Sequence, residues 1–252
     1  MLSEIKTVYL NSRKARDIAW NIWVARPLAA VLVTILRRTP LTPNQVTILG
    51  MFVFFGIIPV GLLLEGTLGF LALALVVQLA YLFDCADGQL ARLKKMTSDA
   101  GAYFDFFIDE IKALLLVAVI AVRLWMQSSD TNWLFVGLLG TIMVSVATSL
   151  TAFVRRPEYS GVEVKPGASA AQPAAPKGLI PKVLWIVQRV ASYIVHYPSW
   201  IIWVALVGFI PGLDAGILFL ALFLGVYALY IARTGLGVLL KLGSPSFYRS
   251  KD

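Results

Sequence analysis

Long apolar stretches alternate with short polar connections along most of the chain. Six stretches approach or exceed the length of a membrane-spanning helix, which needs about 20 mostly apolar residues because only a helix satisfies its own backbone hydrogen bonds in hydrocarbon. They lie at about 45–64, 68–92, 101–126, 132–154, 196–213 and 215–240. The fifth is the weakest, since Pro198 and Pro211 leave an uninterrupted apolar run of only residues 199–210. The pattern predicts an all-α integral membrane protein with six transmembrane helices.

The composition supports this class. Of the 252 residues, 59% are hydrophobic and 14% are charged, whereas soluble domains average about 45–50% apolar and about 25% charged residues. This excess excludes a soluble globular protein and an intrinsically disordered one. The single cysteine, Cys85, excludes a disulfide framework within the chain.

The basic residues predict the orientation. Twenty of the 22 Lys and Arg residues lie in the N-terminal segment, in the connections after the second and fourth stretches, or at the C-terminal end, and the other three connections contain none. Because cytoplasmic loops are enriched in Lys and Arg, both termini are expected in the cytoplasm. The net charge of +8 then favours anionic lipid headgroups over nucleic acid as partners. The plasma (inner) membrane of a prokaryote is the expected location.

The segments outside the apolar stretches divide the chain into an N-terminal segment, a membrane domain and a C-terminal tail. Residues 1–40 carry charges every few positions, which is untypical of a secretory signal. They predict an amphipathic helix in the membrane interface, and a basic tail packed on the rest of the protein is the alternative. The side chains expected to face lipid are Ile18, Ile22, Trp23, Val31, Ile35 and Leu36, and those expected to face phosphate groups are Arg13, Arg16, Arg37 and Arg38. Residues 41–244 form the predicted six-helix domain, with a flexible cytoplasmic loop at about 157–181, and residues 245–252 form a C-terminal tail.

Four aspartates lie where a membrane protein rarely carries charge. Asp84 and Asp87 are three residues apart at the cytoplasmic end of the second stretch, and Asp105 and Asp109 are four apart at the start of the third. Each pair shares one face of a helix. The two helices are antiparallel neighbours joined by a short loop at residues 93–100. The four carboxylates are therefore expected to converge at the membrane boundary.

Carboxylates in this position need a positive partner, because insertion near hydrocarbon and mutual repulsion are both costly. Arg92 and Lys112 are too few to balance the aspartates and the adjacent Glu110. A site made only of carboxylates favours a hard divalent ion, Mg²⁺ or Mn²⁺, over Zn²⁺. Four carboxylates suffice for two ions if some of them bridge, and two ions suit phosphoryl transfer. Gly88 and Ala91 leave room for a ligand close to the backbone.

The spacing Asp84-x2-Asp87-Gly88-x2-Ala91-Arg92-x8-Gly101-x3-Asp105-x3-Asp109 resembles the signature of the CDP-alcohol phosphotransferase (CDP-alcohol phosphatidyltransferase) family of integral membrane enzymes, and it matches at every specified position. The segment Leu41-Thr42-Pro43-Asn44-Gln45-Val46-Thr47 resembles the element that precedes the first helix of the family. By motif, the resemblance covers about residues 40–115 and the rest of the chain only by architecture.

The resemblance implies transfer of a substituted phosphate from a CDP-linked donor to an alcohol, with release of CMP. It implies that Asp84, Asp87, Asp105 and Asp109 bind two Mg²⁺ or Mn²⁺ ions and that Asp109 is also the base that deprotonates the incoming hydroxyl. The nucleotide and diphosphate site would comprise Asp84, Asp87, Gly88, Ala91 and Arg92, with Asn44 and Thr47 at its rim. It also implies a homodimer formed through transmembrane helices.

Other polar residues near the predicted site have two interpretations each. Lys112, Arg155 and Arg156 are candidates to bind a phosphate on the acceptor, while an ion pair for Lys112 and cytoplasmic anchoring for the two arginines are the alternatives. His196 is expected to be an interfacial residue rather than a catalytic one, and Cys85 is expected to be a packing residue.

The aspartates do not identify the donor, because they contact groups that all CDP-linked donors share. CDP-diacylglycerol, used in phospholipid biosynthesis with a polar alcohol or its phosphate as acceptor, is the first expectation. A soluble CDP-polyol such as CDP-inositol is the alternative, favoured by Arg26-Pro27 upstream of residues 39–44, and a CDP-aminoalcohol with diacylglycerol as acceptor stays open. A cation transporter predicts internal repeats and acidic residues within the fourth to sixth stretches, and the sequence has neither.

Overall fold

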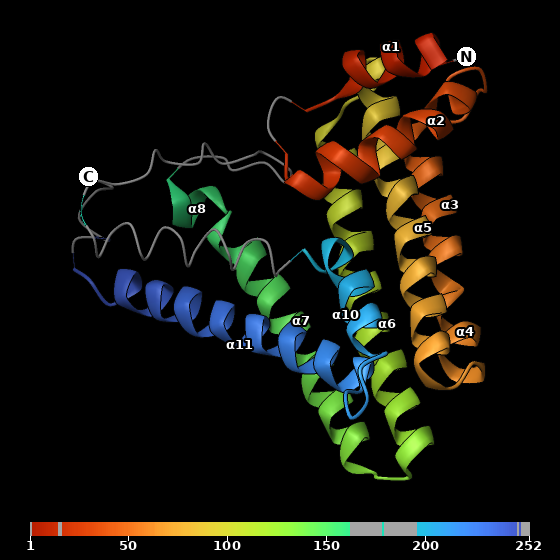
Figure 1. The fold of residues 1–252 in the computed structure, drawn as a ribbon. Helices are drawn as coiled ribbons and strands as arrows, with labels where there is room; N and C mark the ends of the chain where they lie inside the picture. Colours follow the sequence, from red (N-terminus) through yellow and green to blue (C-terminus); the bar gives the residue numbers. More distant parts are fainter. Residues whose placement is uncertain (1, 15–16, 162–177, 179–195, 246, 248–252) are drawn as a thin grey trace.

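The computed structural model describes residues 2–14, 17–161, 178, 196–245 and 247, which form helices and connecting turns without a strand among them (Figure 1). The helices are α1 (Leu2–Ser12), η1 (Asn21–Ala25), α2 (Arg26–Leu36), α3 (Pro43–Phe55), α4 (Ile57–Leu63), α5 (Gly66–Leu93), α6 (Asp99–Ser128), α7 (Asn132–Val154), α8 (Pro157–Ser160), η2 (Tyr197–Ser199), α10 (Ile201–Val207) and α11 (Ala215–Leu242). Arg16, most of the predicted loop at 157–181 and most of the C-terminal tail lie outside the described residues.

Within the described residues, four helical segments are long and apolar enough to cross a membrane. They are Pro43–Leu63, which joins α3 and α4, Gly66–Leu93, Asn132–Val154 and Ala215–Leu242. These segments coincide with the first, second, fourth and sixth apolar stretches of the sequence. The described part of the chain is thus all-helical, and these four segments have the length and composition that an integral membrane protein requires.

The third and fifth stretches differ from the other four. α6 covers the third stretch with 30 residues but is not one of the four membrane-crossing segments. In the fifth stretch, α10 has only seven residues and is about 10 Å long, well short of a bilayer. Pro198 lies in the 3₁₀ turn η2 before this helix, and Pro211 follows it, so the prolines bound the helix. The count of six spans stays a prediction.

Close helix packing around α3, α5 and α6 positions the aspartates. Thr42 and Gln45 form a capping box that fixes the start of α3, with Pro43 in its first turn. A Cβ at Gly50 would lie 2.8 Å from Cβ of Phe83, so α3 and α5 approach each other closely at this point. α3, α5 and α6 run side by side in Figure 1, and α1 and α2 lie across one end of them.

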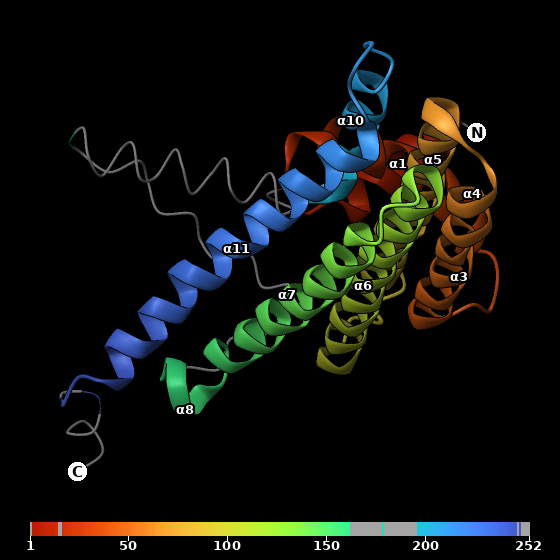
Figure 2. The same ribbon diagram turned by 90° about the horizontal axis from the view of Figure 1, so that it is seen from below.

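α6 and α7 form an antiparallel pair that turns at Ser129, which has a left-handed backbone. Glycines on α7 bring the two helices together. A Cβ at Gly137 would lie 2.6 Å from Cβ of Ala121, and one at Gly140 would lie 2.7 Å from Cγ1 of Val117. α11 runs alongside α7 (Figure 2). Van der Waals packing of this kind drives helix association in lipid, because the helices are already out of water and gain nothing from burying apolar surface.

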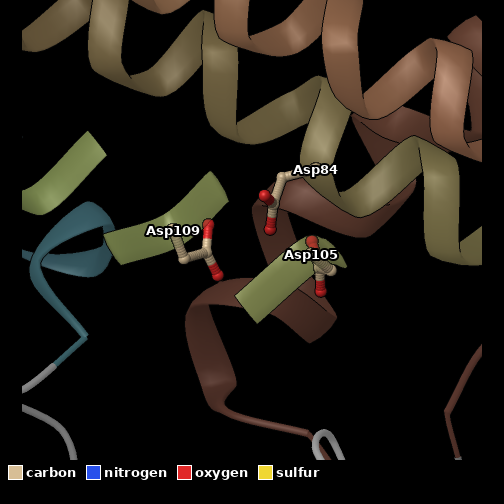
Figure 3. A group of neighbouring side chains, drawn as sticks. All are labelled: Asp84, Asp105 and Asp109. Carbon is tan, nitrogen blue, oxygen red and sulfur yellow. The ribbon is translucent and has the colours of Figure 1, made fainter. Parts of the chain in front are cut away.

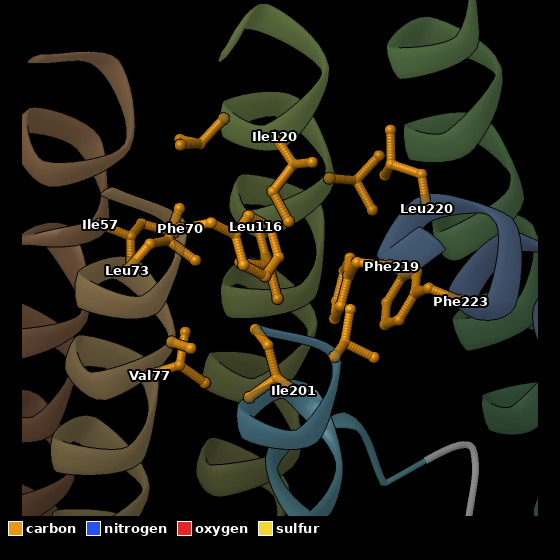
Figure 4. Packing of buried hydrophobic residues seen from close by; sticks show 14 of the residues in the cluster. Ile57, Phe70, Leu73, Val77, Leu116, Ile120, Ile201, Phe219, Leu220 and Phe223 are labelled. Carbon is orange, nitrogen blue, oxygen red and sulfur yellow. The ribbon is translucent and has the colours of Figure 1, made fainter. Parts of the chain in front are cut away.

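A cluster of buried apolar side chains joins α4, α5, α6, α10 and α11 (Figure 4). Phe219 stacks between Trp200 and Phe223, with ring centroids 5.0 Å and 5.3 Å away. Ile201 of the short helix α10 is fully buried in the same cluster. The cluster therefore anchors the segment around η2 and α10 against the long helices.

The N-terminal segment forms three helical pieces, α1, the π-helix η1 and α2, rather than one helix. One face packs on α5 in a cluster of Val8, Ala25, Ala29, Ala30, Val33, Leu36, Val46, Cys85, Ala86 and Leu90. Trp23 and Ile35 are exposed, as expected of lipid-facing residues, but Leu36 is 8% exposed and belongs to the packed face. The expectation for Leu36 is wrong because it shares the α5-facing side of α2 with Ala29 and Val33. The position of this segment in the membrane interface stays a prediction.

Candidate active site

Side chains from the end of α5 and from the beginning of α6 bring three aspartates together. Ser98 caps α6 by accepting a hydrogen bond from the Gly101 amide at 3.0 Å, which starts the helix directly after the short loop. Asp84 projects from α5, and Asp105 and Asp109 project from α6 toward the same point (Figure 3). One carboxylate oxygen from each lies within 4.8 Å of the others.

The donor set of this group fits a hard divalent cation. All three ligands are carboxylates, the oxygen donors that Mg²⁺ and Mn²⁺ prefer. Oδ1 of Asp105 is buried and has no hydrogen-bond partner in the described part of the chain. The side chain of Asp109 is 54% exposed, because it faces a cavity. Like charges this close repel one another unless a cation lies between them.

Lys112 supplies part of the positive charge. Its Nζ lies 2.7 Å from Oδ1 of Asp84 and 3.1 Å from Oδ1 of Asp109, and its side chain is 6% exposed. The structure therefore shows the ion pair that was one of the two interpretations of this residue. One lysine against three carboxylates still leaves an excess of negative charge, which is consistent with a metal site.

Asp87 lies beside this group but outside the set of three. It is 6% exposed and accepts a hydrogen bond at 2.5 Å from the hydroxyl of Thr47 on α3. Thr47 was expected at the rim of a nucleotide site, and the structure places its hydroxyl on a carboxylate that lines the cavity. A direct contact of Asp87 with metal stays a proposal.

Of the remaining residues of the predicted nucleotide site, Gly88 lines the cavity, whereas Arg92 and Asn44 do not. A Cβ added at Gly88 would lie 3.5 Å from Nη1 of Arg92. Arg92 donates through Nε to a backbone carbonyl of α1 at 2.5 Å, and its buried Nη2 has no partner among the described residues. Oδ1 of Asn44 lies at the start of α6, 3.3 Å from where a Gly101 Cβ would be. Ala91 is one turn beyond Asp87 and does not line the cavity.

Arg155 and Arg156, for which acceptor binding and cytoplasmic anchoring were the two interpretations, do not line the cavity. Arg155 ends α7, and its guanidinium carbon lies 5.2 Å from the ring centroid of Phe106, which is a lining residue. Arg156 begins the short helix α8. The structure thus places both arginines outside the cavity, and Arg155 is next to one of its walls.

The cavity has a volume of about 480 Å³ and is also lined by residues that were not assigned to the site from the sequence. The polar ones are Lys14, Asp17, Asn21 and Arg26 from the N-terminal segment, Tyr81, Thr148, Tyr197 and Tyr227. His196, expected to be interfacial, also lines the cavity, and Cys85 both packs in the α5 cluster and lines it. One signal was available: Asp17 is an acidic residue within a strongly basic segment.

Asp17 organises the N-terminal wall of the cavity. Its Oδ2 pairs with Nε of Arg26, and its Oδ1 accepts from Nδ2 of Asn21 at 2.7 Å and from the amide of Ile18 at 2.9 Å. Burial alone would raise the pKa of Asp17, but the charge of Arg26 and these hydrogen bonds outweigh burial and hold the pKa below its usual value. Asp17 is therefore ionised at neutral pH.

Two comparisons with known proteins agree with this geometry. A family model described as CDP-alcohol phosphatidyltransferase matches residues 40–211. The chain is also similar to a protein of Aquifex aeolicus (strain VF5) named "Bifunctional IPC transferase and DIPP synthase", with 30% identity over 114 residues. That similarity covers 42% of this chain and 24% of the Aquifex protein, so the chain spans about a quarter of this relative's length.

Proposed function

The chain belongs to the CDP-alcohol phosphatidyltransferase family and is thus a membrane-embedded transferase of substituted phosphate groups; we propose that it moves such a group from CDP-diacylglycerol to a polar alcohol and releases CMP. The observation that supports this most directly is the group of three carboxylates, from Asp84, Asp105 and Asp109, within 4.8 Å of one another. The cavity of about 480 Å³ beside them gives both substrates a place to meet.

The aspartates have distinct roles in this proposal. Asp84, Asp105 and Asp109, with Asp87 beside them, hold two Mg²⁺ or Mn²⁺ ions. When bound, the ions neutralise phosphate oxygens and orient the reacting groups. Asp109 accepts the proton of the incoming hydroxyl, which its 54% exposure toward the cavity supports. Lys112 holds Asp84 and Asp109 in place from the inner side of the group.

The nucleotide lies toward the cytoplasmic end of α5. Gly88 lets the diphosphate approach the helix backbone, and Arg92, whose Nη2 has no partner among the described residues, binds it. Asn44, Thr47 and Ala91 lie next to this site, outside the residues that line the cavity, and Thr47 acts through its hydrogen bond to Asp87. Arg155 and Arg156 attract a phosphate-bearing acceptor from outside the cavity rather than bind it within.

A soluble CDP-polyol such as CDP-inositol is the second candidate donor. The hydroxyl-bearing side chains that line the cavity favour it. The third arrangement within the family, a CDP-aminoalcohol donor with diacylglycerol as acceptor, is included in the test below.

We further propose six membrane spans, with residues 1–40 as an interfacial segment, residues 41–244 as the catalytic domain, both termini in the cytoplasm of a prokaryote, and a homodimer in the membrane. The distribution of basic residues supports this orientation. Because Cys85 is buried and the only cysteine, single cysteines can be introduced without background labelling. In intact cells an impermeant maleimide should label Thr131→Cys but not Ser3→Cys, and the reverse pattern would overturn the orientation.

Release of CMP from a panel of donors tests the activity. The purified protein is given CDP-diacylglycerol, CDP-inositol, CDP-choline or CDP-glycerol, each with candidate acceptors and Mg²⁺ or Mn²⁺. We expect release from at least one donor, its loss after chelation of the metal, and its loss in Asp84→Ala. Asp130→Asn, an exposed aspartate at the opposite end of α6, is the matched control and should keep full activity. CMP from none of the donors would overturn the proposal and leave a cation-binding transport protein as the alternative.

A further inference from the structure

The cavity continues past the carboxylates into the helix bundle. On α5, Tyr81 and Val77 lie one and two turns before Asp84, and on α6, Ala113 lies one turn after Asp109; all line the cavity. Because α5 and α6 are antiparallel, these residues lie on the same, inner side of the metal-binding group. This inner part is separate from the end of α5 that carries Gly88 and Arg92.

Two tyrosines that line the cavity have hydroxyls without hydrogen-bond partners among the described residues. Tyr197 and Tyr227 line the cavity, and neither hydroxyl has a hydrogen bond to any residue that the structure describes. Their rings are fixed by Phe223, whose centroid lies 5.7 Å from that of Tyr197 and 4.7 Å from that of Tyr227. Each hydroxyl can donate one hydrogen bond and accept others. The fixed rings hold two unused polar groups at defined positions.

A chain of hydrogen bonds determines which nitrogen of His196 is protonated. Asp17 is ionised and only accepts, so Asn21 donates to it through Nδ2 at 2.7 Å. Oδ1 of Asn21 therefore accepts from the hydroxyl of Tyr81 at 2.7 Å. Because the hydroxyl of Tyr81 donates its proton to Asn21, its oxygen accepts a hydrogen bond from Nε2 of His196 at 2.9 Å. Nδ1 of His196 is then the unprotonated nitrogen and a hydrogen-bond acceptor.

Nδ1 of His196 is buried and has no hydrogen-bond partner in the described part of the chain. A buried acceptor without a donor is unfavourable, so such an atom points to a missing partner. This region therefore has three polar groups. The hydroxyls of Tyr197 and Tyr227 can each donate and accept a hydrogen bond, and Nδ1 of His196 can only accept one. A hydroxyl group satisfies all three, whereas an acyl chain satisfies none.

We propose that Tyr197, Tyr227 and His196 form an inner subsite that binds a compact polyhydroxylated group of one of the two substrates. This inference rests on the proposed function and adds the class of alcohol that the enzyme uses. The cavity volume of about 480 Å³ falls within the roughly 300–1,000 Å³ of small-molecule sites. The polyol enters either as the headgroup of a CDP-polyol donor or as the acceptor, free or phosphorylated, and the chemistry of recognition is the same.

Analogues that lack single hydroxyls test the subsite in the full-length purified enzyme. One arm supplies inositol 1-phosphate as acceptor with CDP-diacylglycerol, and the other supplies CDP-inositol as donor; each is repeated with deoxyinositol counterparts, and CMP release is measured. Tyr197→Phe and Tyr227→Phe remove one hydroxyl each and keep the ring, and His196→Phe removes the acceptor nitrogen. Tyr103→Phe, an exposed tyrosine of α6 outside the cavity, is the matched control.

We expect each tyrosine variant to lower kcat/KM for the inositol substrate by roughly 2- to 12-fold, the value of one hydrogen bond. The loss should vanish for the deoxy analogue that lacks the contacted hydroxyl, and Tyr103→Phe should change nothing. The arm that shows this pattern identifies whether the polyol is on the donor or the acceptor. Equal losses for all analogues, or none, would overturn the subsite, as would CMP release only with alcohols that have a single hydroxyl. Absence of CMP with every donor would instead reject the proposed function.

Discussion

Thr47→Val should reduce catalysis because it removes the hydrogen bond to Asp87, along with a longer one to the Pro43 carbonyl of its own helix at 3.2 Å. The substitution replaces a hydroxyl by a methyl group of similar size. Thr47 and Asp87 are 4% and 6% exposed, so water cannot easily replace the 2.5 Å hydrogen bond between them. A hydrogen bond to a charged group contributes about 1.5–3 kcal/mol, and about 1.36 kcal/mol corresponds to a factor of ten. We therefore expect kcat/KM for CMP release to fall roughly 10- to 150-fold.

The matched control is Thr34→Val on α2. Thr34 is also buried, at 7% exposure. Its hydroxyl donates at 2.7 Å to the carbonyl of Ala30 in its own helix, and this carbonyl keeps its helical backbone hydrogen bond when the hydroxyl is removed. Its effect on CMP release should stay within about threefold, because Thr34 does not line the cavity and the lost bond is a neutral one. Rates are measured at saturating Mg²⁺, with Mn²⁺ binding followed by electron paramagnetic resonance. The reasoning about Asp87 is wrong if Thr47→Val and Thr34→Val have the same effect.

Three further predictions follow from the geometry. Asp109→Asn should keep Mn²⁺ binding but lower CMP release by about 10²- to 10⁴-fold, as expected for loss of a general base; full activity would exclude that role. Gly140→Leu should lower the melting temperature of the detergent-solubilised protein, because a Cβ there would lie 2.7 Å from a valine methyl of α6, whereas Gly225→Leu, with nothing within 4 Å, should not. Because Asp17 has a lowered pKa, its ion pair stabilises the fold above the unfolded pKa of about 3.9 and is lost as pH falls through the lower folded value. The melting-temperature difference between wild type and Asp17→Asn should therefore shrink below about pH 4, and a constant difference from pH 7 downward would contradict it.

The proximity of Asp84, Asp105 and Asp109 could be predicted from the sequence because it depends almost only on local spacing. Spacings of three and four residues place each pair of aspartates on one helix face, and the short loop at 94–98 makes the two helices neighbours. Both conditions are set within residues 84–109, so no knowledge of distant contacts is needed. Asp87 is the exception, because its orientation depends on Thr47 of α3.

The rest of the cavity depends on contacts that sequence spacing does not encode. Asp17 reaches the site because α1 and α2 fold across the end of α5, and the sequence predicted one interfacial helix there. Tyr197 and His196 reach it because a short helix at Ile201–Val207 packs inside the bundle. Hydropathy alone cannot distinguish such a half-length helix from a span, although the two flanking prolines indicated a shorter one.

In the proposed site, the residues that are close in sequence carry out the phosphate transfer, and the residues that come from distant segments select the alcohol. In the proposed site the aspartates of α5 and α6 contact groups that every CDP-linked donor shares, so Asp105→Asn should lower the rate with all donors by a similar factor. Tyr197 and Tyr227 come from η2 and α11, and in the proposed subsite they contact only the alcohol. Changes at these two positions should therefore alter the ratio of kcat/KM between substrates and leave the metal affinity unchanged. A chain that keeps the aspartates but differs at η2 and α11 would then catalyse the same transfer with a different alcohol, which is why the motif alone does not identify the substrate.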